Sequence, residues 1–277
     1  MGFMTEKIKI AWFGKHFGEE PPLVGNEKQG SGTIFFSGCN LRCVFCQNFQ
    51  ISQEMMGSDY SIEELADIMI KLQDDGAVNI NLVTPTIWWS KIKNALLIAE
   101  ENGLKIPIAW NSNGYDNIEI LRGMEGLIDI YLPDFKYGID EIGLEYSGVK
   151  NYSQTAISAI KEMLSQAGNL EVDENGIAKK GLIVRHLILP NNLNNSFAAF
   201  KLLSEIDADL YISLMRQYFP LHKASLYPEI ARRVSDDEFE KAYEEFLNLG
   251  FSKGWAQEGE CENIFVPDFR KQNPFEK

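Results

Sequence analysis

Three cysteines lie close together near the start of the chain, at Cys39, Cys43 and Cys46, in the spacing CX3CX2C. Cysteine thiolates bind zinc and iron–sulfur clusters in proteins. Clusters that only carry electrons are usually closed by four cysteines, whereas three cysteines leave one iron of a cubic 4Fe–4S cluster without a protein ligand. An open metal position of this kind can bind a small molecule. The spacing therefore favours one 4Fe–4S cluster with an open iron.

The fourth cysteine, Cys261, lies far along the chain and leaves two other interpretations open. It could complete a structural zinc site, which needs four ligands, or close a cluster that only transfers electrons. A disulfide framework would be unusual in a cytosolic protein of this size. The position of the three clustered cysteines, directly after a predicted buried strand, favours the open cluster.

The elements that position this loop alternate between strand and helix. The apolar run 33–36 is bounded by glycines, as is typical of a buried strand, and the cysteine loop follows it. A capping box of Ser61 and Glu64 begins the next helix, and Gly76 ends it. The sequence predicts further helices over 88–102, 153–166, 196–206 and 235–249, and further strands over 77–83, 106–110, 127–132, 181–189 and 209–215.

This alternation predicts an α/β fold. Nearly continuous apolar strands indicate a parallel sheet covered by helices. About six βα units are too few for a complete eight-fold barrel, so we expect a partial (β/α)6 barrel with outer helices and with its chemistry at the carboxyl ends of the strands. We expect a single domain over 1–277, made of an N-terminal arm and loop (1–32), the partial barrel core (33–215) and a C-terminal helix and tail (216–277).

Composition limits the class of partner. Of the 277 residues, 45% are hydrophobic and 24% are charged, and the formal net charge is −14. Nucleic-acid binders usually carry a basic patch, and the sequence has no Lys/Arg cluster beyond short pairs, so we expect no nucleic-acid partner. No apolar run approaches the roughly 20 residues that span a bilayer, and the N-terminus lacks the order of a signal peptide. We therefore expect a cytoplasmic protein with no membrane partner.

The cysteine loop resembles a known signature. CX3CX2C with an aromatic residue, Phe45, before the third cysteine is similar to the cluster loop of radical S-adenosylmethionine enzymes. The longer string GEEPPLVGNEKQGSGTIFFSGCNLRCVFCQN, with VTPT at 83–86, NSNGYD at 111–116 and PDFK at 133–136, resembles the PflX-like relatives of pyruvate formate-lyase activating enzyme. The chain lacks the extra N-terminal cysteines and the ferredoxin-like insert of some relatives, so we expect one cluster.

The resemblance implies an activity. The open iron would bind S-adenosylmethionine, and its reductive cleavage would give a 5′-deoxyadenosyl radical that abstracts a substrate hydrogen. The favoured substrate is a glycine of a glycyl-radical enzyme, and a low-potential donor such as flavodoxin or ferredoxin would supply the electron. Two alternatives remain: radical modification of another protein, peptide or metabolite, and a non-catalytic iron–sulfur or zinc protein.

The resemblance also implies which residues bind the cofactor. Phe45 would pack near the adenine, and the VTPT turn, with Thr84 and Thr86, would hold the methionyl amine. The sugar and a monovalent cation would lie near Asn111, Ser112, Asn113, Asp134 and Lys136. Each of these has a plainer interpretation as core packing, a turn or an exposed ion pair.

Arg185 interrupts an apolar strand, where a buried arginine needs a carboxylate or similar partner. By the resemblance it would contact the cofactor. The neighbouring His186 points to the opposite face of the strand, which indicates a structural role. The sequence assigns no role to His222, Trp255, Gln257 or Cys261.

Overall fold

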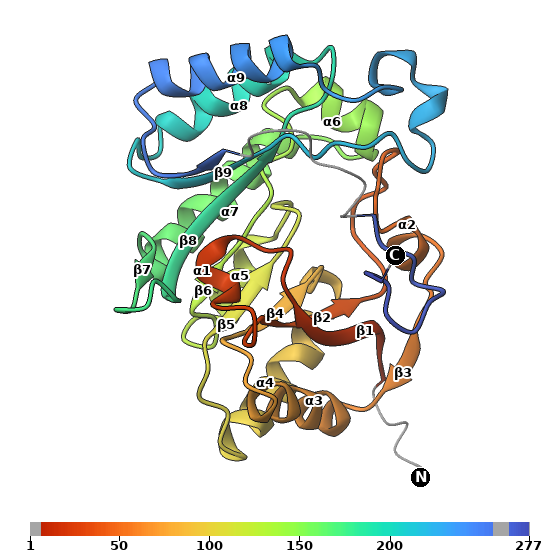
Figure 1. Cartoon of the computed structure of the whole chain (residues 1–277), viewed down its shortest axis with the longest axis vertical. Coiled ribbons are helices and arrows are strands. Elements are labelled where there is room, and N and C mark those ends of the chain that lie inside the picture. The colour runs from red at the N-terminus through yellow and green to blue at the C-terminus, as the bar shows by residue number, and fades with distance from the viewer. Residues whose placement is uncertain (1–6, 257–265, 277) are drawn as a thin grey trace.

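The computed structural model describes residues 7–256 and 266–276. It confirms an α/β fold built on one mostly parallel sheet (Figure 1). The strand order is β10-β9-β8-β6-β5-β4-β2-β1-β3, and β7 pairs with β8 beside this path. The strands are β1 (Ile8–His16), β2 (Ser31–Phe36), β3 (Ser58–Tyr60), β4 (Ile80–Val83), β5 (Ile108–Asn111), β6 (Ile130–Tyr131), β7 (Glu171–Val172), β8 (Ala178–Leu187), β9 (Tyr211–Met215) and β10 (Gly254–Ala256).

The parallel part of the sheet runs from β2 through β4, β5, β6, β8 and β9 to β10. Helices alternate with these strands as expected of a partial barrel. They are α1 (Pro21–Val24), α2 (Phe49–Ser52), α3 (Ile62–Asp74), α4 (Trp89–Glu101), α5 (Ile118–Gly123), α6 (Asp140–Ser147), α7 (Tyr152–Ala167), α8 (Leu193–Ser204) and α9 (Asp236–Asn248), with short 3-10 turns at Thr86–Trp88, Ala224–Leu226 and Pro228–Ile230. No helix in these described ranges is long and apolar enough to cross a membrane.

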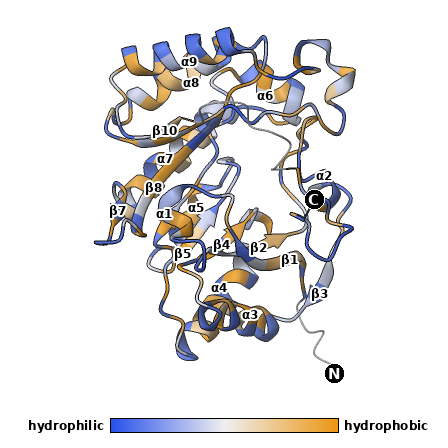
Figure 2. Ribbon diagram, viewed as in Figure 1, coloured by the Kyte–Doolittle hydropathy of each residue, from blue (hydrophilic) through white to orange (hydrophobic). Residues whose placement is uncertain are grey.

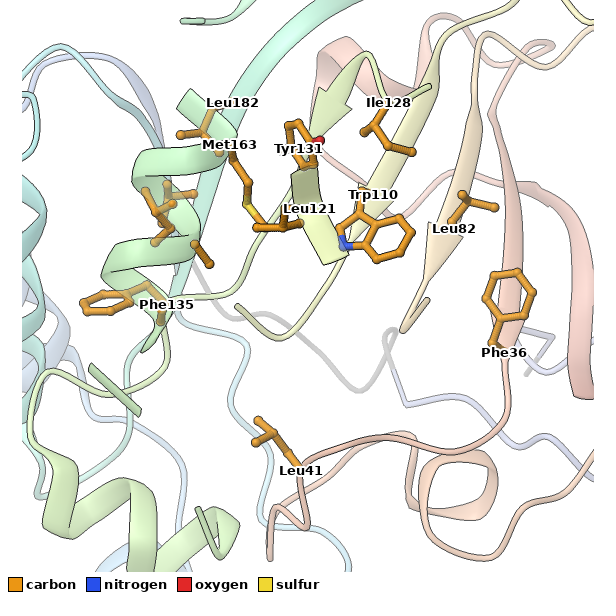
Figure 3. Packing of buried hydrophobic residues seen from close by; sticks show 14 of the residues in the cluster. Phe36, Leu41, Leu82, Trp110, Leu121, Ile128, Tyr131, Phe135, Met163 and Leu182 are labelled. Carbon is orange, nitrogen blue, oxygen red and sulfur yellow. The ribbon is translucent and has the colours of Figure 1, made fainter. Parts of the chain in front are cut away.

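The main core lies between one face of the sheet and the helices that cover it. Figure 3 shows strand side chains such as Leu82, Trp110 and Tyr131 beside Leu121 and Met163 of the covering helices. Helix α3 begins with the predicted capping box. The side chains of Ser61 and Glu64 each accept a hydrogen bond from the other residue's backbone N–H. Along α9, apolar and polar residues alternate because only one side of the helix is buried (Figure 2).

The N-terminal arm is more ordered than the sequence predicts. Residues 8–16 form β1, which pairs antiparallel with β2 on one side and β3 on the other. The sequence-based expectation of an arm and loop missed this strand because its pairing with β2 and β3 joins residues that are distant in sequence. The division into arm, core and tail stays a prediction.

Helix α1 lies on the inner face of the sheet, beside β5, β6 and β8 (Figure 1). Its Leu23 is fully buried and packs with Ala109, Ile130 and Ile183 from those strands. The Leu23 carbonyl accepts a hydrogen bond of 2.8 Å from the buried Asn79 side chain. The arm therefore fills part of the space that the open barrel encloses.

The described part of the C-terminal tail, residues 266–276, packs on β2. Phe269 and Phe275 make ring contacts with Phe35 of β2, at 5.5 and 5.6 Å between centroids. Gln50 of α2 ties the tail to the segment that follows the cysteines, because its amide donates to Asp268 and accepts from the Phe269 N–H. This part of the tail thus contacts both β2, which precedes the cysteines, and α2, which follows them.

Replacing Leu23 by Ala should lower the free energy of unfolding by about 2–5 kcal/mol, because a buried leucine side chain leaves a cavity when it is truncated. The same change at Leu226, which is 73% exposed, should alter it by less than about 0.5 kcal/mol. Chemical denaturation of both variants measures the difference. Equal effects would mean that the arm is not packed inside the barrel.

Candidate active site

The cysteine loop begins at the carboxyl end of β2, and each sulfur has a hydrogen-bonding neighbour. The Asn113 amide donates to the Cys39 Sγ at 3.3 Å, and the Ser147 hydroxyl donates to the Cys43 Sγ at 2.9 Å. The Cys46 Sγ lies 3.2 Å from the hydroxyl of Ser52. Hydrogen bonds to cluster sulfurs are one way in which proteins tune iron–sulfur clusters. The donor set therefore fits three thiolate ligands.

Three elements hold the backbone of this loop. The N–H of Val44 donates to the Tyr146 carbonyl near the end of α6, and the Val44 carbonyl accepts from the N–H of Lys223. The Gln53 side chain donates to the Cys43 carbonyl at 3.0 Å. Hydrogen bonds from α6, from the segment after β9 and from Gln53 at the end of α2 thus hold the loop in place. Its conformation does not depend on the metal alone.

Burial raises the pKa of all three thiols, that of Cys43 to about 12. Each must lose its proton to bind iron, so the charge of the bound metal has to offset this burial. Among the described residues, no three His, Cys, Asp or Glu side chains gather around one point as ligands to a single ion. The cysteine spacing and the hydrogen bonds to sulfur therefore carry the metal assignment.

Phe45 is buried in the loop and makes an edge-on ring contact with Tyr218, at 5.6 Å between centroids. The structure thus places it in the core beside the third cysteine. Its predicted packing against adenine stays a prediction.

Asp134 and Lys136 follow β6 and form an ion pair, with Lys136 Nζ 2.5 Å from Asp134 Oδ2. Burial alone would lower the pKa of Lys136, but the Asp134 carboxylate and the neighbouring thiols raise it to about 12. Lys136 therefore remains a cation and also lowers the pKa of the thiols of Cys39 and Cys43. The predicted charged pair after the fourth parallel strand lies electrostatically close to the cluster loop.

Tyr152 locks this strand end to its neighbour. Its fully buried hydroxyl accepts from the N–H of Lys136 and lies 2.8 Å from the carbonyl oxygens of both Asn113 and Asp134. Gly114 lies in the same crowded place at φ +76°, where a Cβ would meet the Asp134 carbonyl oxygen at 2.2 Å. Only glycine fits there, so the Asn-Gly turn is a requirement of the site.

The turns after β4 and β5 carry the remaining predicted residues of the VTPT and NSNG strings. Thr84 has φ +60° and donates its N–H to the Asn111 carbonyl. The hydroxyls of Thr86 and Ser112 both donate to Asp116, at 2.7 and 2.5 Å. The structure thus brings these turns together side by side, and it directs two of the predicted hydroxyls to a carboxylate that the sequence had not singled out.

Arg185 is paired with two glutamates of the N-terminal arm. Its Nε donates to Glu20 at 2.8 Å, its Nη2 donates to both Glu19 and Glu20, and its Nη1 reaches the Asn111 side chain at 3.3 Å. Burial opposes the charged form of Glu19, but Arg185 and His16 lower the pKa of this carboxyl to about 2. The carboxylates that the sequence led us to expect beside this buried arginine are therefore Glu19 and Glu20. Contact of Arg185 with a cofactor stays a prediction.

His186 and His222 lie in different surroundings. His186 is fully buried, and its ring nitrogens lie within hydrogen-bond distance of the Phe135 carbonyl and the Ser196 hydroxyl. Burial lowers its pKa to about 4, so it is neutral and structural, as its strand position indicated. His222 stacks on Phe49 after the cysteine loop, at 4.8 Å between centroids.

Trp255 lies in β10 and makes a ring contact with Tyr211. Gln257 and Cys261 lie outside the described residues. Sequence reasoning missed Glu19, Glu20, Asp116, Ser147 and Tyr152. An arginine in an apolar strand signalled that carboxylates were needed, and only the folded chain shows which ones they are.

The pairing of Arg185 predicts a large and pH-dependent effect of Arg185→Met. Two buried carboxylates would lose their cation, which should cost about 3–5 kcal/mol of unfolding free energy at neutral pH. In the parent, the contribution of Glu19 is present above its ordinary pKa of 4.5 and is lost as pH falls towards 2. The gap between variant and parent should therefore narrow below about pH 4.5.

Thermal unfolding across this pH range measures the gap. Arg122→Met is the matched control, because Arg122 pairs with Glu119 and Glu162 at the surface and should change stability by at most about 1 kcal/mol. Similar losses in the two variants would contradict the buried pairing.

Two proteins of Methanocaldococcus jannaschii, both called uncharacterised, are similar to this chain. The protein MJ0674 is 37% identical over 239 residues, which cover 83% of this chain and 64% of the relative. The protein MJ0808 is 26% identical over 170 residues, covering 59% of this chain and 44% of the relative. The chain therefore spans less than two thirds of the length of these relatives.

Parts of this chain are similar to solved structures. SuiB of Streptococcus suis, bound to S-adenosylmethionine, gives a TM-score of 0.50 at 17% identity, over 80% of this chain and 45% of that one. A domain of pyruvate-formate lyase-activating enzyme from Bacteroides vulgatus gives 0.46 at 11% identity, over 63% and 94%. TYW1 with a lysine-pyruvate adduct bound gives 0.49 at 13% identity, over 83% and 77%.

The model of the Radical SAM superfamily matches residues 33–168. This segment begins with β2 and contains the three cysteines, the turns after β4 and β5, and the Asp134–Lys136 pair. Over residues 33–168 the chain is therefore similar to the Radical SAM superfamily, and the first parallel strand of its sheet leads into the cysteine loop.

Proposed function

We propose that this protein cleaves S-adenosylmethionine reductively at a single 4Fe–4S cluster and uses the resulting radical to abstract a hydrogen atom from a substrate. The observation that carries the proposal is the cysteine loop itself. Cys39, Cys43 and Cys46 follow the first parallel strand, and each sulfur has a protein hydrogen-bonding partner. When bound, the cluster supplies one electron to the sulfonium, which gives methionine and a 5′-deoxyadenosyl radical.

The residues around the loop would hold the reactants in place. The Asp134–Lys136 pair places a fixed carboxylate and a fixed ammonium beside the cysteines. A carboxylate favours an amine or a cation, and an ammonium favours a carboxylate. The polar turns after β4 and β5 lie along the same edge, and their side chains are held in place by Asp116 and Arg185. Such an edge suits the zwitterionic methionine part of S-adenosylmethionine.

The finer proposal is that the hydrogen comes from a macromolecule, with a glycine of a glycyl-radical enzyme as the favoured case. Its support is that the inner face below the site is already occupied. Leu23 packs against β5, β6 and β8, and Phe269 packs on β2. A substrate would then approach from the rim, as a protruding protein segment can. A low-potential donor such as flavodoxin or ferredoxin would supply the electron.

Removing the ligand thiols tests the cluster. After anaerobic reconstitution, the parent should bind close to four irons and release 5′-deoxyadenosine from S-adenosylmethionine and dithionite. Cys39→Ala, Cys43→Ala and Cys46→Ala should each lose both properties, because each removes a ligand. Iron analysis and chromatography of the nucleoside measure them. Cys261→Ala is the matched control, and loss of iron in that variant would show a closed cluster or a zinc-type site instead.

Electron spin resonance tests the substrate proposal. The reduced protein, mixed with S-adenosylmethionine and a candidate glycyl-radical enzyme, should produce the doublet of a glycyl radical. Omitting S-adenosylmethionine, or using Cys43→Ala, should abolish the signal. Turnover of a free small molecule without any protein partner would contradict a macromolecular substrate while leaving the cleavage reaction intact.

A further inference from the structure

Asp116 is a carboxylate buried without an ion pair. Its side chain is 1% exposed, and among the described residues no basic group forms a salt bridge with it. It lies with Asn40 and Thr86 at a pocket of about 750 Å³ between α4, α5 and α7. Removing a charge from water is costly unless polar partners replace the solvent. The burial of Asp116 therefore indicates that its hydrogen bonds have a specific role.

The partners of Asp116 belong to two different turns. Thr86, after β4, donates its hydroxyl to Oδ1, and Ser112, after β5, donates its hydroxyl to Oδ2. Burial raises the pKa of Asp116, and these hydroxyls oppose the rise. The indole N–H of Trp110 also lowers the pKa, although it does not meet the geometry of a hydrogen bond. One side chain thus joins the ends of two adjacent parallel strands.

The turn on the Thr86 side is strained. Thr84 has φ +60°, which is rare for any residue with a Cβ and more so for a β-branched one. Such a conformation persists only when its surroundings hold it. The Thr84 N–H is fixed to the Asn111 carbonyl, and the Trp88 N–H to the Pro85 carbonyl. The hydroxyl of Thr86 supplies a third restraint, and Asp116 is its acceptor.

The turn on the Ser112 side leads to the cluster loop. Ser112 Oγ also accepts from the N–H of Gly114, which fixes the start of the Asn-Gly turn. The next residue, Asn113, donates its amide to Asn40 at 2.6 Å and to the Cys39 sulfur at 3.3 Å. A continuous series of contacts therefore runs from the strained Thr84 turn through Asp116 to a cluster ligand.

We propose that Asp116 is a positioning residue for S-adenosylmethionine. It holds the Thr84–Thr86 turn in register with the cysteine loop by accepting hydrogen bonds from the hydroxyls of Thr86 and Ser112. This inference rests on the proposed function. In the structure both hydroxyls donate to Asp116, one to each carboxyl oxygen, and this fixes their orientation. An asparagine of the same shape would offer one acceptor and one donor, and it would reverse one of the two hydroxyls.

The first test uses the protein without S-adenosylmethionine. In Asp116→Asn, hydrogen exchange of the Thr84 and Trp88 amides should be at least tenfold faster than in the parent, because the restraint on Thr86 is lost. Asp129→Asn is the matched control. The Asp129 carboxylate also accepts a hydrogen bond, from the Ile108 N–H at 2.8 Å, but it lies at the amino end of the same strands. Unchanged exchange in Asp116→Asn, or an equal change in Asp129→Asn, would overturn the proposal.

The second test measures binding of S-adenosylmethionine to the reconstituted protein by equilibrium dialysis. Asp116→Asn and Thr86→Val should each weaken binding about tenfold at unchanged iron content, which is the scale of one lost hydrogen bond to a charged group. The double variant should be no worse than either single one, since both break the same contact. Asp129→Asn should bind as the parent does.

The outcomes separate this inference from the function on which it rests. A parent that holds four irons but binds no S-adenosylmethionine would refute the proposed function, and the exchange test would still decide whether Asp116 holds the Thr84–Thr86 turn. Parental affinity in Asp116→Asn, or additive losses in the double variant, would refute the positioning role alone.

Discussion

A guanidinium inside a barrel stays charged, so the chain has to bring carboxylates to it. Arg185 projects from β8 toward the inner face, and Glu19 and Glu20 meet it from the N-terminal arm. Each ion costs several kcal/mol to bury, and only their mutual attraction and complete hydrogen bonding offset that cost. The pairing therefore fixes where the arm runs. With the glutamates in place, α1 follows directly, and its Leu23 reaches the apolar patch on β5, β6 and β8.

The strand ends are joined to one another by side chains and not by the sheet alone. Strand β6 contributes only two residues to the ladder, so its register needs other support. Tyr152 supplies part of it, because its hydroxyl is hydrogen-bonded to the Asp134 carbonyl and to the Lys136 N–H. The Asp134 N–H donates in turn to the Ser112 carbonyl. Hydrogen bonds consequently connect the charged pair, the Asn-Gly turn and the cysteine loop to one another.

Local patterns predicted much of this architecture. The capping box placed the start of α3, and apolar strands between amphipathic helices placed β2, β4, β5, β8 and β9 to within a few residues. Strand β1 and helix α1 escaped prediction because their partners are distant in sequence. In the site, the cysteine spacing needed no structure. Asp116 was not predicted, because an aspartate after an Asn-Gly turn is typical of an exposed turn. Only the folded chain shows that it is buried and accepts hydrogen bonds from Thr86 and Ser112.

Helix α1 has a consequence for how this scaffold can diversify. In most barrel enzymes the strands and their following loops set the shape of the chamber. Here a segment that precedes the first parallel strand occupies the inner face, held by Leu23 and two glutamates. Changes of sequence in that short arm would therefore alter how the inner face is covered while the strands and the cysteine loop keep their own hydrogen bonds. The cover of the inner face and the cysteine loop are encoded in separate parts of the chain.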